Sequence, residues 1–190
     1  SRTARLRAAL HRARLGGGLV VVEGDAGQGK SRRLRAFARS AAAAGLIVTR
    51  VTCSKETVLD FDGDVLIVDD AQHLDADGWR ALLKWQAEAR KSLVVAATRP
   101  LRTWPPWRAE ALDEARKVLG GGSLILDGLP REEIDLLVAT KVSAEVHPAF
   151  GDALHRYARG NPFIVADLVD ALAEKGDLVR ASGKVAFVGD

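Results

Sequence analysis

The stretch GDAGQGKS at residues 24–31 combines glycines at positions 24, 27 and 29 with a lysine and a hydroxyl. It fits the phosphate-binding pattern G-x-x-x-x-G-K-[ST] at every fixed position. The glycines let successive backbone N–H groups turn toward phosphate oxygens, and the N-terminus of a following helix adds its positive dipole end. Lys30 would then contact the β- and γ-phosphates, and the Ser31 hydroxyl would coordinate Mg²⁺. The stretch predicts a nucleotide site; the alternative is a glycine-rich turn that binds nothing.

A second chemical motif is the apolar run DVLIVDD at residues 64–70, which ends in two carboxylates. A strand that ends in aspartate delivers Asp69 to the edge of the sheet, where it can hold Mg²⁺ through water. Asp70 is placed to orient or deprotonate an attacking water. Adjacent carboxylates repel each other, and a divalent ion offsets that repulsion. The alternative for Asp70 is a strand that simply ends in a turn.

The third motif is SLVVAATRP at residues 92–100, where Thr98 and Arg99 follow an apolar run. If this strand lies between the first and third strands, Arg99 can contact the γ-phosphate and detect its presence. Taken alone, Arg99 is better explained as a surface arginine. The sensing hypothesis therefore depends on the two preceding motifs.

The elements that must position these motifs alternate between strands and helices. Helical patterns cover residues 4–14, 30–44 and 76–91, whereas Trp104 and Trp107 are interpreted as part of an extended loop. Short apolar runs predict five strands, at residues 19–23, 46–52, 64–70, 92–98 and 123–129. This alternation predicts an α/β fold with a five-stranded parallel sheet covered by helices on both faces. The crossover over residues 53–64 is short for parallel neighbours, so we expect a missing segment near residues 53–60.

The pattern changes after residue 129. Pro130 with two following acids opens one helix, residues 148–160 form a second, and Asn161 with Pro162 caps a third. A strand pair with a turn at residues 182–184 ends the chain. We predict a nucleotide-binding domain over residues 1–129, a helical lid subdomain over 130–176, and a hairpin or the start of a further domain over 177–190.

Composition and charge limit the classes of function. The chain has 190 residues, a net charge of +3, one cysteine (Cys53) and no methionine, which favours a cytoplasmic fragment of a longer protein. No apolar run approaches the roughly 20 residues of a membrane span, so we expect no membrane partner. The first fifty residues carry eleven Lys and Arg residues against only Glu23 and Asp25. This basic region could meet nucleic acid or an acidic domain, or simply form a phosphate-binding edge.

Five segments together resemble the STAND class of AAA+ P-loop ATPases, and within it the ATPase domains of large bacterial LuxR-type transcriptional regulators. The segments at 19–34 and 66–83 resemble the Walker A and Walker B regions of that class. The segment at 94–100 resembles its sensor-one strand, and that at 128–138 the start of its helical subdomain. Residues 157–172 resemble its GxP segment, with Gly160 and Pro162 in the named places.

The resemblance implies roles beyond the phosphate site. Pro162 would lie on the nucleotide base and Arg2 near adenine, although a helix stop followed by a cap explains residues 160–162 equally well. Winged-helix, sensor and helix-turn-helix domains would follow Asp190, with DNA bound through one of them, and nucleotide-dependent homo-oligomers are possible partners. The residues expected to contact ATP or ADP are Gly24, Gly27, Gln28, Gly29, Lys30, Ser31, Arg32, Pro162 and Arg2; Ser31 and Asp69 would hold Mg²⁺, and Lys30, Asp70 and Arg99 would be catalytic.

These observations predict an ATP-binding and slowly hydrolysing switch module of a multidomain signal-transduction regulator. One alternative is a DNA-handling AAA+ ATPase of the replication-initiator or transposition type, whose basic first third would contact phosphates. Another is an autoinhibition module that retains ADP and does not hydrolyse ATP.

Overall fold

The computed structural model describes residues 8, 17–54, 61–88, 92–126, 128–181 and 183–188. The chain divides into two compact units, residues 1–25 with 30–126 and residues 26–29 with 127–190. Three sequence predictions lie outside the described residues: the helix over 4–14 apart from Ala8, the adenine contact of Arg2, and the missing segment near residues 53–60.

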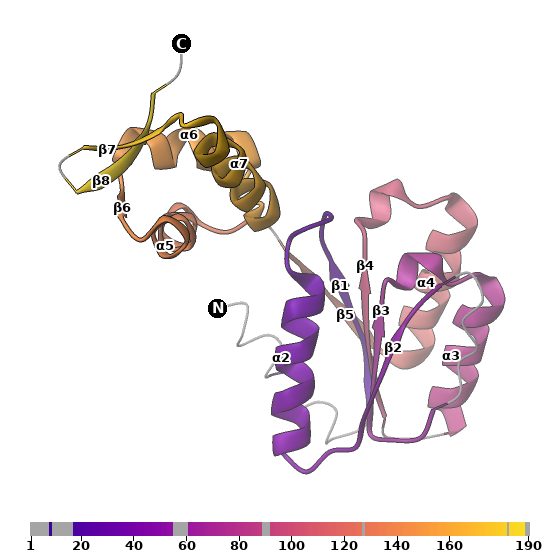
Figure 1. The fold of residues 1–190 in the computed structure, drawn as a ribbon. Coiled ribbons are helices and arrows are strands. Elements are labelled where there is room, and N and C mark those ends of the chain that lie inside the picture. The colour runs from indigo at the N-terminus through magenta and orange to yellow at the C-terminus, as the bar shows by residue number, and fades with distance from the viewer. Residues whose placement is uncertain are drawn as a thin grey trace. The chain divides into compact units, whose positions relative to one another are not determined.

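The first unit is built on a five-stranded parallel sheet with the strand order β2-β3-β4-β1-β5 (Figure 1). Its central strands are valine-rich and almost completely buried, as a strand covered on both faces requires. The strands are β1 (Gly18–Glu23), β2 (Val48–Thr52), β3 (Val65–Asp69), β4 (Leu93–Thr98) and β5 (Gly121–Ile125). The predicted α/β class is confirmed, and β4 lies between β1 and β3 as expected.

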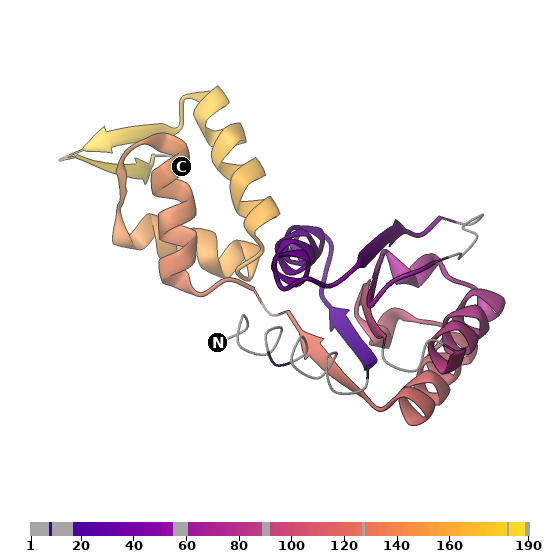
Figure 2. The ribbon, with the colours of Figure 1, turned by 90° about the horizontal axis from the view of Figure 1, so that it is seen from below.

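Helices cover both faces of this sheet (Figure 2). On one face α2 (Lys30–Ala43) packs with Leu34 and Phe37 against the strands. On the other face α3 (Ala76–Glu88) and α4 (Pro106–Leu119) contribute Trp79 and Leu112 to a second core. Short 3₁₀ turns, η1 (Ala71–His73) and η2 (Leu101–Thr103), follow β3 and β4. The two apolar cores pack against the strands from both faces of the sheet. This packing holds the carboxyl ends of the strands in place at one edge of the sheet.

α4 and β5 differ most from the sequence prediction. Trp107 lies in the first turn of α4 rather than in an extended loop, since Pro106 suits the start of a helix. The fifth strand runs from Gly121 to Ile125 instead of over residues 123–129. Glycine is depleted in strands, so the glycines at 120–122 concealed the beginning of β5 in the sequence.

The strand register shows where the sheet opens. The pairing of β3 with β4 ends at Val68 and Ala96. On the other side of β4, pairing with β1 continues to Glu23 and Thr98. Open α/β sheets bind ligands at this carboxyl edge, and the three sequence motifs follow β1, β3 and β4 there.

The second unit contains three helices around a small apolar core. Its buried residues include Ile134, Leu154 and Val165, and a three-stranded sheet in the order β6-β8-β7 completes it. Asn161 caps the last helix as predicted, because its Oδ1 accepts a hydrogen bond from Phe163 N at 3.0 Å. The elements are α5 (Arg131–Val142), β6 (Glu145–Val146), α6 (Pro148–Ala158), α7 (Pro162–Lys175), β7 (Leu178–Ala181) and β8 (Lys184–Phe187).

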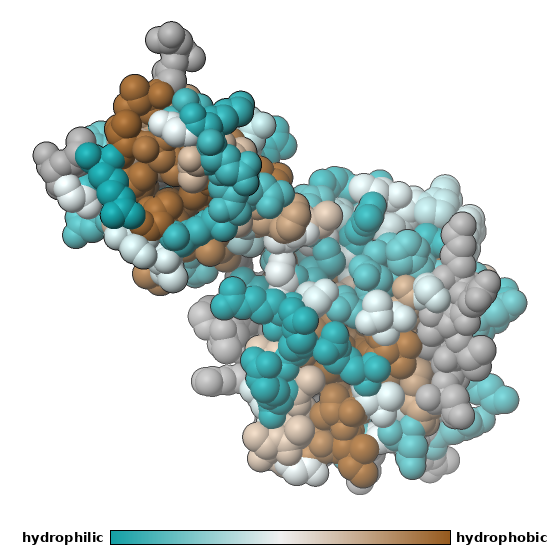
Figure 3. Space-filling model, viewed as in Figure 1, coloured by the Kyte–Doolittle hydropathy of each residue, from teal (hydrophilic) through white to brown (hydrophobic). Residues whose placement is uncertain are grey.

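This second unit has an open apolar cavity of about 800 Å³. Hydrophobic side chains of α6, α7 and β8 line it, and the hydrophobic colour gathers on this unit in Figure 3. Tyr157 and Phe187 both line the cavity and are largely exposed to solvent. A unit of this size lacks the volume to bury all of its apolar surface.

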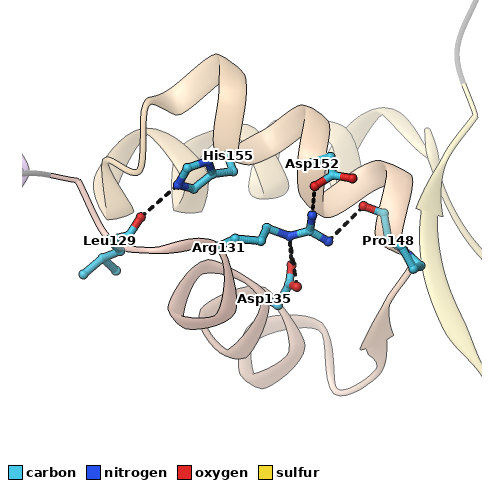
Figure 4. Close-up of polar contacts among 6 residues, drawn as sticks. All are labelled: Leu129, Arg131, Asp135, Pro148, Asp152 and His155. Carbon is cyan, nitrogen blue, oxygen red and sulfur yellow. Dashed lines mark hydrogen bonds and ion pairs between the residues drawn. The ribbon is translucent and has the colours of Figure 1, made fainter.

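An arginine joins α5 to the start of α6. Arg131 Nε donates to Asp135 Oδ1 at 2.9 Å, its Nη2 donates to Pro148 O at 2.9 Å, and its Nη1 pairs with Asp152 (Figure 4). Gly151 lies against this cluster, and a Cβ there would collide with the carboxylate of Asp135 and the guanidinium of Arg131. In the observed arrangement of the cluster, position 151 has room for a glycine, and a larger residue must displace the ends of the Arg131 and Asp135 side chains.

We expect Gly151→Ala to lower the free energy of unfolding of the second unit by about 1–3 kcal/mol, because the added methyl group must separate Arg131 from Asp135. Urea denaturation followed by circular dichroism measures this change, with Ala149→Gly on the same helix as the control. Alanine has the higher helix propensity by about 1 kcal/mol. An increase in stability would therefore show that the cluster imposes no constraint on residue 151.

Candidate nucleotide-binding site

The glycine-rich loop connects β1 to α2 at the carboxyl edge of the sheet. Gly27 and Gly29 have φ angles of 79° and 76°, a left-handed backbone that other residues rarely adopt. Directly after the loop, α2 begins at Lys30, so the N-terminus of a helix, with its positive dipole end, follows the loop. The local backbone is therefore shaped as an anion site.

Lys30 is a buried cation, only 8% exposed. Its Nζ donates hydrogen bonds to Gly24 O at 2.8 Å and Asp25 O at 2.9 Å. Desolvation lowers the pKa of Lys30, and the negative charges of Asp70 and Asp69 oppose that shift. The ammonium group is thus held by backbone carbonyls that phosphate oxygens can replace as acceptors.

The two carboxylates after β3 have different surroundings. Asp69 is 3% exposed; its Oδ1 accepts a hydrogen bond from Asp70 N at 3.2 Å, and its Oδ2 lies 4.0 Å from Arg50 Nη2. Asp70 is half-buried and has φ 56° and ψ 39°, a left-handed conformation that costs a non-glycine residue about 1 kcal/mol. Strained backbone of this kind concentrates at functional sites.

Gln72 is a site residue that sequence reasoning missed. It lies in η1, is 8% exposed, and its Nε2 donates to Asp70 Oδ1 at 2.9 Å. Its Oε1 accepts a hydrogen bond from Arg99 N at 3.3 Å. The only signal in the sequence was a polar residue two positions after the second carboxylate.

The end of β4 completes this edge. Thr98 O accepts a hydrogen bond from Gly24 N at 3.2 Å, which fixes the beginning of the loop. Thr98 is 1% exposed, and within the described part of the chain its Oγ1 has no hydrogen-bond partner. Because buried hydroxyls are normally paired, this atom is suited to meet a ligand or a water. The side chain of Arg99 is exposed and free to contact a bound group.

Glu23 is a second residue that the sequence analysis did not identify as part of the site. Its Oε2 accepts a hydrogen bond from Leu101 N at 3.2 Å, and its Oε1 lies 3.6 Å from Arg116 Nη2. Glu23 is the last residue of β1, directly before the glycine-rich loop. It therefore ties the start of the loop to the turn after β4.

Cys53 follows β2, and its N–H donates to Asp69 O at 2.9 Å. Burial, together with the charges of Asp70 and Asp69, raises the pKa of the Cys53 thiol to about 11.

Because of this raised pKa, the reactive thiolate of Cys53 is scarce at pH 8. We expect native protein to react with iodoacetamide at least about 100-fold more slowly than urea-unfolded protein. Mass spectrometry of the labelled chain measures both rates; equal rates would contradict the buried position of the thiol.

The oxygen groups fit a magnesium ion that is bound together with a nucleotide. Ser31 in the first turn of α2 and Asp69 at the end of β3 offer a hydroxyl and a carboxylate oxygen. Among the described residues, no group of three or more His, Cys, Asp or Glu side chains is arranged to hold a metal. Mg²⁺ commonly takes one or two protein ligands and completes its shell with phosphate and water oxygens. The residues present are therefore compatible with Mg²⁺ that arrives with phosphates.

The structure gathers some of the predicted residues and leaves others elsewhere. Lys30 lies close enough to Asp25, Asp69, Asp70 and Arg99 for each charge to affect its pKa. Gln28 is half-buried in the loop and Arg32 is exposed on α2. Pro162 is the first residue of α7 in the second unit. The predicted phosphate and metal residues thus lie at one edge of the sheet, while the adenine contacts stay predictions.

The first unit has the fold of AAA+ P-loop ATPases, with a five-stranded parallel sheet, the 2-3-4-1-5 order and the loop after β1. No family model and no curated protein matches the sequence. Within the described ranges, no helix is long and apolar enough to span a bilayer.

Solved structures do match. A DNA replication initiation factor has a TM-score of 0.65 at 15% identity, over 91% of this chain and 60% of its own. AMPPCP-bound DnaA from Aquifex aeolicus has a TM-score of 0.64 at 16% identity, over 91% of this chain and 61% of its own. The Thermotoga maritima RuvB Holliday junction branch migration motor has a TM-score of 0.61 at 17% identity, over 91% of this chain and 61% of its own. The chain therefore spans about three-fifths of each of these proteins. At such identities the likeness establishes the fold, and the resemblance to LuxR-type regulators stays a hypothesis.

Proposed function

We propose that the chain binds ATP with Mg²⁺ and hydrolyses it slowly. The observation that carries this proposal is the buried Lys30 ammonium, which donates to the carbonyls of Gly24 and Asp25 and is near the carboxylates of Asp69 and Asp70. Burying a lysine ammonium costs free energy unless an opposite charge pairs with it. A triphosphate that replaces the two carbonyl acceptors supplies that opposite charge.

Each residue of the edge then has a distinct role. The loop N–H groups and Lys30 bind the β- and γ-phosphates, and Ser31 and Asp69 hold Mg²⁺, which supplies charge stabilisation for the phosphoryl group. Asp70 orients the attacking water and accepts its proton. Arg99 contacts the γ-phosphate, which distinguishes ATP from ADP. The base contacts of Pro162 and Arg2 rest on the family resemblance.

The first test is to denature freshly purified protein and to identify any released nucleotide by chromatography. Release of about one equivalent of ADP or ATP per chain supports a nucleotide site that retains its ligand. If no nucleotide is released, titration with Mg²⁺ and ATP, followed by phosphate release, decides the question. Absence of both binding and turnover would contradict the proposal.

A DNA-handling role is the candidate that the structural likeness favours over a regulatory switch. The similar structures include a replication initiation factor, a branch migration motor, and a DnaA bound to AMPPCP and single-stranded DNA. In this chain, α2 contains no acidic residue. Its arginines 32, 35 and 39 are exposed at helical spacing and form one basic stripe. Such a stripe is suited to contact phosphates.

This second candidate is tested by the ATP turnover with and without single-stranded DNA at several salt concentrations. A DNA-handling ATPase is expected to be stimulated by DNA, with affinity that falls steeply as salt rises. Arg35→Ala combined with Arg39→Ala should weaken DNA binding, whereas Lys84→Ala on α3 is the matched control. No binding of DNA by the chain would favour the switch module of a LuxR-type regulator. In such a regulator, a separate helix-turn-helix domain would bind the DNA. ADP that stays bound without any ATP turnover would instead indicate an autoinhibition module.

A further inference from the structure

The side chain of Gln72 connects the segments that follow β3 and β4. Backbone pairing of these strands ends at Val68 and Ala96. Beyond that point, Gln72 connects the side chain of Asp70 on the β3 side to the backbone of Arg99 on the β4 side. The bridge therefore joins the candidate catalytic carboxylate to the candidate γ-phosphate sensor.

The chemistry of the two partners fixes the orientation of the Gln72 amide. The Arg99 backbone N–H can only donate, so the Gln72 oxygen must face it. An ionised Asp70 carboxylate can only accept, so the Gln72 NH₂ group must face Asp70. A side-chain amide offers a donor and an acceptor without a charge, and the Gln72 side chain reaches both partners. Because Gln72 is buried, water does not readily replace either bond.

We propose that Gln72 is a positioning residue that couples the sensor end of β4 to the Asp70 carboxylate. This inference rests on the proposed ATPase function and names the connection within the same site. When Arg99 moves toward a γ-phosphate, its backbone N–H pulls on the Gln72 oxygen. The Gln72 NH₂ group then changes the position of the Asp70 carboxylate. ATP and ADP thereby set different orientations of the group that acts on water.

Two variants separate the halves of the bridge. Gln72→Met has a similar length and removes both hydrogen bonds, whereas Gln72→Glu keeps an acceptor for Arg99 N–H but replaces the donor with a negative charge beside Asp70. We expect the Arg99 amide to exchange with water at least about 5-fold faster in Gln72→Met and at the wild-type rate in Gln72→Glu. Nuclear magnetic resonance on ¹⁵N-labelled full chain measures this rate, with exposed His73→Ala as the control. An unchanged rate in Gln72→Met would overturn the bridge.

The coupling itself has two further readouts. Replacing ADP by AMPPCP, both with Mg²⁺, should shift the Asp70 amide signal in wild type and not in Gln72→Met. Both Gln72 variants should lower kcat at least about 10-fold with nearly unchanged affinity for ATP. Adding Gln72→Met to Asp70→Asn should cause no further loss of kcat, because Gln72 acts through Asp70.

These outcomes distinguish the inference from the proposed function. A wild-type chain that binds nucleotide without turnover, yet shows the expected exchange and signal changes, would refute hydrolysis and support the bridge. A wild-type chain that hydrolyses ATP, with kcat and Arg99 exchange unaffected by Gln72→Met, would support the function and refute the bridge.

Discussion

Lys30→Met is expected to lower the affinity for Mg²⁺ and ATP by a factor on the order of 100, because it removes the charged hydrogen bonds to the β- and γ-phosphates. The same change should not lower the stability of the ligand-free protein. Methionine has a similar length and fits a position that is only 8% exposed. It also removes a charge that the protein has to keep out of water.

The sign of the stability effect follows from the pKa of Lys30. Desolvation lowers that pKa from its ordinary value of 10.5. The unfolded chain therefore binds the proton more tightly than the folded chain, so the charge costs stability at neutral pH. This cost decreases as the pH rises above the folded pKa and disappears above about 10.5, where Lys30 is neutral in both states. Lys30→Met removes the cost at every pH.

Thermal denaturation with and without Mg²⁺ and ATP measures both effects. Wild type should melt at a higher temperature with the nucleotide present, as mass action requires, whereas Lys30→Met should show a much smaller shift at the same ATP concentration. Lys84→Met, on the exposed surface of α3, is the matched control and should respond like wild type. An equal shift by ATP in wild type and Lys30→Met would refute the role of Lys30 at the phosphates.

Asp70→Asn is expected to abolish most hydrolysis while it preserves binding. An amide cannot accept the proton of an attacking water, and loss of a general base lowers kcat by about 10²–10⁴-fold. The local structure should survive, because the Asn oxygen can still accept the hydrogen bond from Gln72 Nε2. Asparagine also tolerates the left-handed backbone at position 70. The affinity for ATP should therefore change by less than about 3-fold.

Single-turnover phosphate release and equilibrium binding separate these two quantities. Asp77→Asn, on an exposed carboxylate in the first turn of α3, serves as the control for a lost negative charge. Equal turnover in Asp70→Asn and wild type would exclude Asp70 as the base. A large loss of ATP affinity would instead place Asp70 among the groups that bind Mg²⁺.

The sequence predicted those parts of the fold that depend on local patterns. Buried strands appear as apolar runs, and the glycine loop has its own spacing, so both were found from residues close together in the chain. The hypothesis for Arg99 required the fourth strand to lie between the first and the third, and the strand order meets this condition.

Contacts between distant residues could not be predicted in this way. Gln72 connects Asp70 with Arg99, and Arg99 lies 27 residues after Gln72 in the chain. Glu23 accepts a hydrogen bond from Leu101 N, which lies 78 residues further along the chain. Both contacts exist only because the strand order brings the ends of β1, β3 and β4 together. The roles of Lys30 and Asp69 carry a sequence signature, whereas a polar residue such as Gln72 becomes informative only when its two partners are known.

The left-handed backbone of Asp70 sets stability against activity at a single residue. Glycine would adopt φ 56° without a steric cost and would relieve about 1 kcal/mol of strain. It would also remove the carboxylate and the acceptor of Gln72. Loss of that acceptor leaves a buried amide donor unpaired, which costs about 1–3 kcal/mol and outweighs the strain. A library of variants sorted only for resistance to heat would therefore reject Gly at position 70 and accept Asn, which keeps the acceptor and tolerates the left-handed backbone. Such a sort would yield a durable protein with a silent site.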